Sequence, residues 1–559
     1  MKELSKPTVQ TVSKRYHDSL LFNTELGLYD TVRKNENFFI GKQWEGVEAN
    51  GLPTPVFNFL KRVVLFQVAT ITSDNIAMQA SPLASTSRYD LWDIDQVADV
   101  INKQFKSIFE RCQLVGLLRE YMRNAAVDGD GCLYTWFDPS IENGQDVKGE
   151  IVTEVVENTR VHFGNPNSRD VQSQPWMILA RRMTVEDAME LAEENGIPEA
   201  ERQPIAPDAE DFCNPADAMT SDKVTVLTYL YRSRETKTIW KYVCTRSAEL
   251  QEATDTGLTL YPIVWLNWDY VQDNYHGQAM ITGLIPNQVF INKLFAMSMI
   301  SLMTTAYPKI VYDKTRVKSW DSRVGAAIGV NGGDMNSVAK IIDPAQISPQ
   351  IAQFIQLAVD YTQSFLGASD VAMGNARPDN TSAIVALQRA SNVPMEITKQ
   401  NLYKSVERLG RIYIDHMRNY YGVRYVQIRM NMKEKQMPLG IRLPDQDFNR
   451  PFDFSVLKEI PMSIQLDVGA SSYWSEIASQ QTLDNLLVQN KIDLVDYLER
   501  IPNGYITKKQ ELIEKLKAAQ QPQQGAEKAI LDTNQTLPVP IGGGNGALQR
   551  AIAETGVSK

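Results

Sequence analysis

Residues 275–308 read YHGQAMITGLIPNQVFINKLFAMSMISLMTTAYP, and this stretch decides how the rest of the chain is organised. The pattern over 284–306 is typical of one long helix. Pro286 lies near its start, where a missing backbone N–H is tolerated, and Pro308 lies beyond its end. Lys293 is its only charged residue. A helix that is apolar nearly all round must be covered by protein, so we expect neighbours on every side.

A membrane span is the alternative for this stretch, because it is the most apolar window of the chain. The uncharged run begins at Leu294 and reaches Pro308 after about 14 residues, short of the ~20 that cross a bilayer. We therefore interpret it as a helix buried in protein. A second helical pattern, IAQFIQLAVDYTQSFLG, begins at Ile351 after Pro349 and stops at Gly367.

The segment between these two helices predicts a small β-rich insert. Strand-like runs read YPKIVYD at 307–313 and AKIIDP at 339–344, with a glycine-rich turn at 329–333 between them. The insert also carries a cationic cluster, which comprises Lys309, Lys314, Arg316, Lys318 and Arg323. Such a cluster is either a solvated face or a docking surface for an acidic partner or DNA, and the sequence leaves both open.

Composition indicates a large soluble protein of three or four domains. The chain has 559 residues, of which 43% are hydrophobic and 22% charged. Its formal net charge is −10, so contact with DNA must be local or weak, because DNA binders carry a basic face that displaces counterions. The N-terminus lacks a signal peptide's apolar core, and four cysteines without a C-x-x-C pair predict free thiols in a reducing compartment.

The other segments predict an α+β fold that is mainly helical. We expect helices at 8–36, after the cap Asn58, at 91–109, 114–126, 184–195 and 383–421, the last kinked at Pro394. We expect strands at 75–83, 150–156, 176–182, 223–232, 238–244, 263–269, 424–432 and 461–469, with a polar loop between the last two. Residues 130–270 therefore form an antiparallel region. Residues 473–516 are again helical, and the Gln-, Pro- and Gly-rich tail predicts a flexible end.

Two acidic stretches invite a ligand-binding interpretation. Residues 128–131 read DGDG, but a calcium loop would need spaced ligands and a terminal glutamate, so we predict a tight turn between a helix and a strand. Residues 186–217 are strongly acidic and contain several prolines. This composition favours an exposed outer loop over a binding site for a basic partner.

Enzyme motifs are absent from the sequence. It contains no G-x-x-x-x-G-K-[ST] phosphate loop, no H-E-x-x-H and no G-x-S-x-G. Its histidines, His17, His162, His276 and His416, lie far apart, and we assign them structural roles. We therefore predict no catalytic residue, no metal site and no cofactor.

The order of these features resembles the portal protein of tailed double-stranded DNA bacteriophages over roughly residues 20–516. The resemblance rests on NFFIGKQWEG at 37–46, FNFLKRVVLFQVATITSDNIAMQASP at 57–82, the turn 275–277, the insert, SFLGASDVAMGN at 364–375 and TSAIVALQRAS at 381–391. It implies a portal fold with wing, stem, clip and crown regions, assembled as a ring.

The resemblance also implies how the chain divides. Residues 1–274 would be the N-terminal part of the wing, 275–306 the first stem helix, 307–349 the clip, 350–370 the second stem helix, 371–382 the tunnel loop, 383–467 the long kinked helix and C-terminal part of the wing, 468–516 the helical crown and 517–559 a flexible tail.

The implied function is a twelve-fold ring at one capsid vertex, assembled in the host cytoplasm. Double-stranded DNA passes through it during packaging and ejection, the terminase large subunit and then the head-tail adaptor dock on it, and the major capsid protein and scaffold are further partners; no membrane is involved. Candidates for the channel are Asn375, Arg377, Asn380 and Asp360, although Asn375 and Asn380 would equally suit plain turns. Candidates for clip docking are Lys314, Arg316, Lys318 and Arg323.

Other functions would need other features. A metal-dependent nucleic-acid enzyme needs acidic residues clustered on ordered elements, whereas those of this chain concentrate at 186–217. A membrane pore would insert 284–306. Another virion structural or scaffold protein would form shells or remain monomeric.

Overall fold

The computed structural model describes residues 6–49, 51, 53–74, 76–83, 91–209, 222–306, 310–321, 323, 327–334, 337–341, 353–358, 360–361, 395–429, 447–460, 462–468, 483–484, 487, 489, 491–500 and 512–513. The chain forms two compact units, Met1–Ser472 and Tyr473–Lys559. Of the described residues, 46% are helical and 23% lie in strands, which confirms the expected α+β, mainly helical class.

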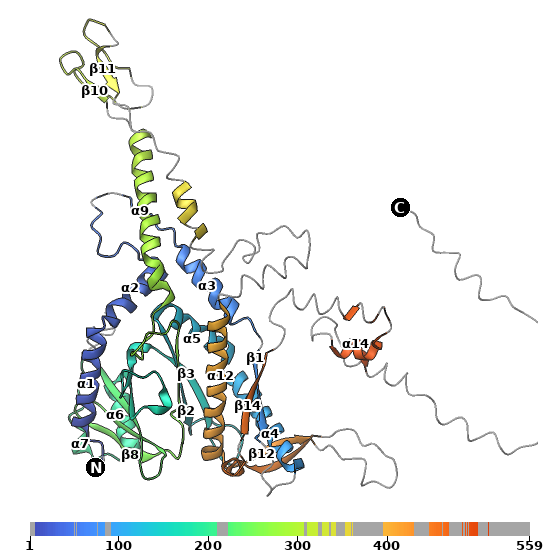
Figure 1. Ribbon diagram of the computed structural model, residues 1–559. Coiled ribbons are helices and arrows are strands. Elements are labelled where there is room, and N and C mark those ends of the chain that lie inside the picture. Colours follow the sequence, from blue (N-terminus) through green and yellow to red (C-terminus); the bar gives the residue numbers. More distant parts are fainter. Residues whose placement is uncertain are drawn as a thin grey trace, which may run out of the picture. The chain divides into compact units, whose positions relative to one another are not determined.

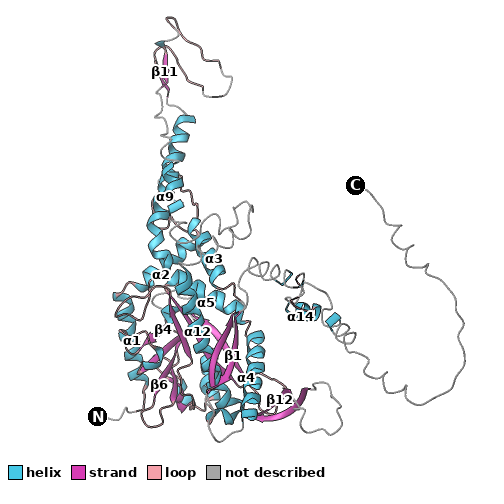
Figure 2. Cartoon of the chain, turned by 45° about the vertical axis from the view of Figure 1, so that its right-hand side comes forward, coloured by secondary structure: helices cyan, strands magenta, loops and turns pink. Residues whose placement is uncertain are grey.

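Five helices precede the main sheets of the first unit (Figures 1 and 2). They are α1 (Val9–Glu25), α2 (Leu28–Ile40), α3 (Phe59–Ile71), α4 (Leu91–Arg111) and α5 (Leu114–Asp128). The single helix expected over 8–36 is instead two helices, because Gly27 takes a left-handed φ of 65° between them. The predicted cap is confirmed: Oδ1 of Asn58 accepts a hydrogen bond from the backbone N–H of Lys61 at 3.1 Å.

Two antiparallel sheets form the region that the sequence predicted between 130 and 270. The three-stranded sheet has the order β3-β2-β9, with β2 (Asp130–Asp138), β3 (Glu150–Val156) and β9 (Ile263–Asn267). The five-stranded sheet has the order β4-β5-β6-β7-β8, with β4 (Val161–Phe163), β5 (Trp176–Thr184), β6 (Lys223–Arg232), β7 (Ile239–Cys244) and β8 (Glu249–Asp255). Strands β4 and β8 were not predicted. Two 3₁₀ turns, η1 (Asn158–Arg160) and η2 (Val171–Ser173), lie beside β4.

Short acidic helices cover one end of the five-stranded sheet. Helix α6 (Val185–Glu194) begins as predicted, with the Thr184 side chain accepting from the N–H of Asp187 at 3.1 Å, and α7 (Glu199–Arg202) follows it. Both pack on β8. Residues 210–217 of the expected acidic outer loop lie outside the described residues.

Helix α9 (Met280–Ala306) is the long helix expected from the opening stretch, and it leaves the body between α2, α3 and α5 (Figure 1). It begins four residues earlier than its pattern indicated, so Pro286 lies at its seventh position and not in the first turn. The predicted insert is confirmed as a β pair: β10 (Ile310–Tyr312) runs antiparallel to β11 (Ala339–Ile341). The described parts of the second helical pattern, 353–358 and 360–361, are helical as predicted.

The remaining elements of the first unit that the structure describes lie between Glu396 and Val468. Helix α12 (Glu396–His416) continues into a π turn, η5 (Met417–Tyr421), and is followed by β12 (Val423–Arg429), β13 (Asp447–Asp453), the 3₁₀ turn η6 (Phe454–Lys458) and β14 (Met462–Val468). Strand β13 lies where a polar loop was expected. Its sequence, DFNRPFD, is polar and contains a proline, yet it pairs with β12 along its whole length. In the second unit, α14 (Leu494–Arg500) is described.

One large core joins elements that are far apart in sequence. It contains Leu60 of α3, Ile101 of α4, Tyr121 of α5, Ile281 of α9 and Tyr413 of α12, each at most 2% exposed, together with β1 (Ile76–Pro82), which pairs antiparallel with β14. The first turns of α9 therefore pack in the same core as the N- and C-terminal parts of the unit.

Candidate functional site: helix α9, its base and the β10–β11 tip

A buried carboxylate holds the turn that precedes α9. Asp130, at the start of β2, is fully buried, and its Oδ1 accepts from the N–H of Gly277 and from Nδ2 of Asn267, both at 2.7 Å. Its Oδ2 accepts from Nδ1 of His276 at 2.7 Å and from Nδ2 of Asn158 at 3.3 Å. Because nitrogen donors surround both oxygens, the carboxylate is satisfied within the protein.

This arrangement gives the DGDG run a structural role. The predicted turn is confirmed, with Gly129 at φ 104° between α5 and β2. No group of three His, Cys, Asp or Glu that could hold a metal ion occurs in the described part of the chain. Sequence reasoning found the turn and the Tyr-His-Gly segment separately, but nothing in the pattern linked Asp130 to His276, 146 positions away.

Aromatic rings pack around the same turn. Tyr275 is 1% exposed, and its ring stacks on Phe163 with centroids 4.5 Å apart. Its hydroxyl donates to Oδ1 of Asn23 at 3.2 Å, while its carbonyl accepts from Nε1 of Trp265 at 3.0 Å. The turn is thus fixed to α1, β4 and β9 at once, and it sets the direction in which α9 leaves the body.

A ladder of buried amides secures the first half of α9. Nε2 of Gln288 donates to the carbonyl of Phe57 at 2.8 Å and to Oδ1 of Asn292 at 2.9 Å. Nδ2 of Asn292 in turn donates to Oε1 of Gln43 at 2.6 Å. Lower on the helix, Nδ2 of Asn35 donates to the Thr282 hydroxyl at 2.8 Å. These bonds fix the rotation of α9 against α2 and α3, since buried amides left unpaired would be costly.

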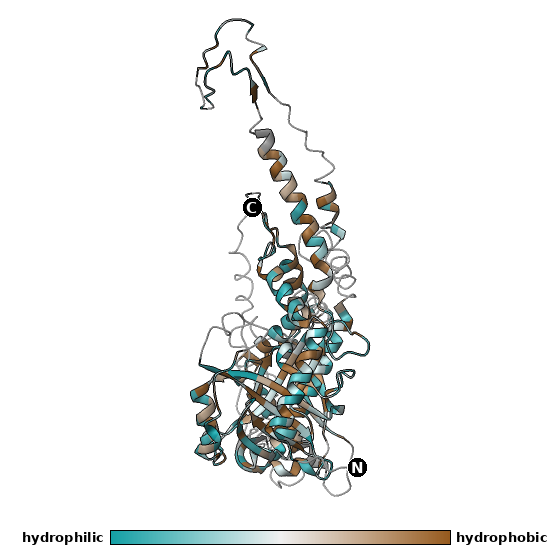
Figure 3. Ribbon diagram, turned by 90° about the vertical axis from the view of Figure 1, so that its left-hand side faces the viewer, coloured by the Kyte–Doolittle hydropathy of each residue, from teal (hydrophilic) through white to brown (hydrophobic). Residues whose placement is uncertain are grey.

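Several apolar side chains in the second half of α9 are exposed in a single chain. Met297, Leu302 and Met303 are 58%, 61% and 53% exposed, and Figure 3 shows apolar colour along this part of the helix. Within one chain, the protein cover that we expected around α9 is therefore present only on the side of the helix that packs against α2, α3 and α5. In the neighbouring helical segment, Phe354, Leu357 and Tyr361 share a face and are also exposed. Among the helices of the described residues, none is long and apolar enough to span a bilayer.

The β10–β11 tip pairs two of its four candidate cations internally. Three hydrogen bonds join the Arg323 guanidinium to the Asp321 carboxylate, the shortest at 2.6 Å. Arg316 lies 3.6 Å from Asp313 and donates to the hydroxyl of Ser337 at 3.0 Å. Lys314 and Lys318 are exposed, and neither forms an ion pair with any residue that the structure describes. The free positive charge of the tip is thus carried by its lysines.

Comparison with protein families decides which class of molecule these features belong to. The family model described as Phage P22-like portal protein matches residues 22–537, which is most of the chain. The chain belongs to this family. A search of curated proteins found no match. Portal proteins are structural components of the phage capsid, where they occupy a vertex, and they are not enzymes.

The channel candidates of this portal protein are only partly described. Asp360 lies on the helical segment that follows α9 in the chain, is exposed, and accepts from Nε2 of Gln356 at 2.8 Å. Asn375, Arg377 and Asn380 lie outside the described residues, as does the whole segment 371–382 that we expected to be a tunnel loop.

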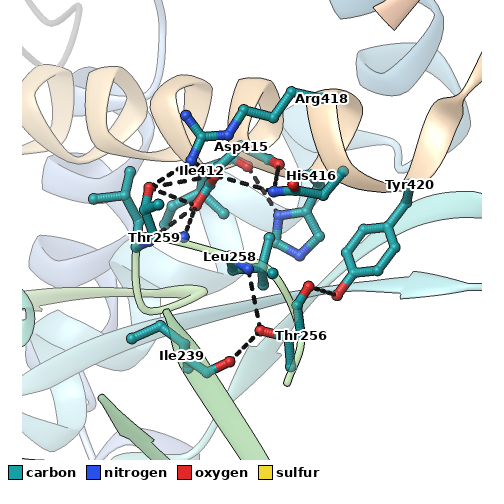
Figure 4. Close-up of polar contacts among 12 residues, drawn as sticks. Ile239, Thr256, Leu258, Thr259, Ile412, Asp415, His416, Arg418 and Tyr420 are labelled. Carbon is teal, nitrogen blue, oxygen red and sulfur yellow. Dashed lines mark hydrogen bonds and ion pairs between the residues drawn. The ribbon is translucent and has the colours of Figure 1, made fainter. Parts of the chain in front are cut away.

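A second polar network ties the end of α12 to the loop before β9 (Figure 4). The Asp415 carboxylate is 3% exposed and accepts from the N–H groups of Thr259 and Leu260 at 2.8 and 2.9 Å, with Arg418 at 2.6 Å. The Tyr420 hydroxyl donates to the carbonyl of Thr256 at 2.8 Å. Sequence reasoning missed this network, because its partners lie in a polar loop without a recognisable motif.

Burial shifts the pKa of several side chains in the first unit of the portal protein. Burial, opposed by Arg123, raises the pKa of Asp128 from 3.8 to about 7. Burial lowers the pKa of His162 to about 3, so its ring is neutral, and it packs edge-on against Tyr16 at 5.0 Å. Cys112, Cys132 and Cys244 are free thiols, and burial raises the pKa of each. They are therefore inert structural cysteines.

Proposed function

We propose that this chain forms a ring at one capsid vertex, through which double-stranded DNA enters the capsid during packaging and leaves it during ejection. The observation that carries the proposal is the half-covered helix α9. Its inner half is fixed to the body by buried amides, while Met297, Leu302 and Met303 remain exposed beyond it. A group of exposed apolar side chains on one helix marks an interaction surface, because covering it removes apolar area from water.

A closed ring would supply that cover. Each subunit of a cyclic ring presents two different complementary surfaces, so the exposed half of α9 would pack on helices of the next copy. Burial of apolar surface contributes about 25 cal/mol per Å², and repetition around the ring multiplies the gain. Twelve copies are expected from the family resemblance.

The charge of the chain suits a conduit for DNA. A net charge of −10 disfavours strong phosphate binding, so DNA would slide and not be trapped. In this proposal, 275–306 and 350–370 are the stem, 307–349 the clip, 371–382 the tunnel loop and 468–516 the crown, with the wing in 1–274 and 383–467. Asn375, Arg377, Asn380 and Asp360 would face the channel.

The tip would be the docking platform for the terminase large subunit and then for the head-tail adaptor. Lys314 and Lys318 are the stronger candidates, because Arg316 and Arg323 already have carboxylate partners in the chain. Exposed internal pairs are worth little, so both arginines could still exchange partners on docking.

Electron microscopy of the purified chain, with native mass spectrometry to count subunits, tests the proposal. A ring of about twelve copies with an open channel is the expected result. A protein that stays monomeric at high concentration would contradict it. Within rings, replacing Arg377 by Ala should leave assembly intact but alter packaging; unchanged packaged DNA length and yield would remove that residue from the channel.

A further inference from the structure

A small cavity lies beside helix α12. It has a volume of about 130 Å³ and opens between α12, η2 and β9. Leu260, Trp265 and Ile412 give it an apolar floor, and Arg408 and Arg411 stand at its edge. A cavity of about 150 Å³ holds a benzene ring, so this one suits a single medium-sized side chain.

The cavity is preformed. Its Leu260 wall is held by Asp415, which accepts hydrogen bonds from the N–H groups of Thr259 and Leu260 (Figure 4). The 3₁₀ turn η2, which also lines the cavity, is held by Gln172, whose Oε1 accepts from the N–H of Tyr261 at 2.9 Å. Binding of a ligand would therefore cost little conformational entropy, because the residues that line the cavity are already ordered.

Two exposed arginines line the cavity although the chain is acidic. Arg408 is exposed and has no carboxylate partner among the residues that the structure describes. Among the described residues, Arg411 pairs with Glu407, one turn away on α12, at 2.5 Å. Asp170 is the acidic residue at the cavity, and its carboxylate already accepts from the N–H of Gln172. An apolar lining beside Arg408, whose guanidinium has no carboxylate partner among the described residues, suits an apolar side chain flanked by carboxylates.

The same chain presents such a group on α6. Glu186, Met189, Glu190 and Glu193 follow the i, i+3, i+4, i+7 spacing of one helix face. Met189 is 38% exposed at the centre of that face, while the opposite face buries Ala188 and Ala192 against the sheet. Methionine is unbranched and adapts to irregular cavities.

We propose that α6 of one copy docks on this cavity in the neighbouring copy, with Met189 inserted and Glu186 and Glu190 paired with Arg408 and Arg411. The inference rests on the proposed ring. Helix α6 packs on β5, β6 and β8, whereas α12 packs on β2, β9 and β14, so the two surfaces belong to different parts of one subunit. Two such unlike, complementary surfaces are what a closing ring requires.

Charge reversal tests the pairing on the full-length chain. The double variant Arg408→Glu, Arg411→Glu and the double variant Glu186→Lys, Glu190→Lys should each raise the protein concentration at half-assembly by at least about tenfold, measured by sedimentation velocity. Combining all four substitutions should restore assembly, because opposite charges face each other again. Arg234→Glu, an equally exposed reversal in the β6–β7 turn, serves as the control and should assemble normally.

The outcomes separate this inference from the proposed ring. If the unsubstituted chain forms rings and both reversals assemble as it does, the α6 contact is wrong and the ring stands. If each reversal blocks assembly but the fourfold variant does not recover, the two surfaces do not meet, and the inference also fails. If the unsubstituted chain never forms a ring, the proposed function itself fails. Met189→Asp, which would place a charge against the apolar lining, should impair assembly.

Discussion

Nδ1 of His276 lies 2.7 Å from Oδ2 of Asp130, and this contact joins the turn before α9 to the first residue of β2. The same carboxylate accepts from the backbone N–H of Gly277. The direction of α9 is therefore set by a fully buried charged group and not by apolar packing alone. If the turn moved, the Asp130 carboxylate would lose its hydrogen-bond donors. This cost favours a single arrangement of the turn before α9.

Replacing Asp130 by Asn should destabilise the chain by about 3 kcal/mol, because an amide cannot accept from four donors and points its own N–H groups at some of them. Urea unfolding at a fixed protein concentration measures the loss. Asp146→Asn is the matched control, since Asp146 is exposed in the β2–β3 connection, and it should change stability by less than about 0.5 kcal/mol. Equal midpoints for both variants would show that the buried network contributes nothing.

Two glycines at the base of α9 should respond to alanine in opposite directions. At Gly277 an added Cβ would lie 2.7 Å from Cβ of Asn267 and from the carbonyl of Asp269, so the turn must move. We expect a loss of at least about 2 kcal/mol. At Gly283, inside α9, nothing lies within 4 Å, and alanine should stabilise the helix by about 1 kcal/mol. Thermal unfolding of the two variants is the test; a shift of the same sign in both would refute the steric account.

Local signals predicted helices and their caps well, whereas distant partners escaped sequence reasoning. Asn58 and Thr184 cap their helices as expected, because an N-cap involves residues only three positions apart. The strand β13 was missed, since Pro451 and its polar neighbours carry no alternating pattern and its stability comes from pairing with β12. Asp130 was interpreted only as part of a turn. Its function in the fold depends on donors that the chain supplies more than a hundred positions later.

The sequence predicted that protein covers α9 on every side, and a single chain confirms this only in part. The reason is again that a sequence pattern does not identify distant partners. Apolar residues all round a helix show that it is covered, but not by what. Within one chain, its body-facing side meets α2, α3 and α5, whereas Met297, Met299, Leu302 and Met303 are exposed. The remaining cover is a property of the assembly and not of the single sequence read as a monomer.

Asp128 should make stability depend on pH. Its pKa rises from 3.8 to about 7 in the folded chain, so between these values the folded state holds a proton that the unfolded state has released. Stability therefore falls as pH rises from about 4 to 7, and the penalty is complete above 7. The Asp128→Asn side chain cannot ionise. At pH 8 this variant should be more stable than the unsubstituted chain by about 2 kcal/mol, after allowance for partial solvent screening. At pH 4 the two proteins should have nearly the same free energy of unfolding.

Urea unfolding at the two pH values checks this prediction. Glu142→Gln, an exposed substitution that also removes one negative charge, separates the local effect from that of net charge and should show no such difference. A gain for Asp128→Asn that is as large at pH 4 as at pH 8 would mean that the substitution acts through packing and not through ionisation.

The exposed half of α9 gives the last prediction. Replacing both Met297 and Leu302 by Asp should leave the melting temperature of the monomer nearly unchanged, because both side chains are more than half exposed in one chain. In the proposed ring the same carboxylates would be buried without partners, at a cost of several kcal/mol per copy. The variant should therefore sediment as a monomer. Leu21→Asp, at a residue 50% exposed on α1, tests whether any charge on an apolar surface has this effect. Rings that form equally well in all three proteins would show that the outer half of α9 does not lie between copies, and its exposure would then need a different partner.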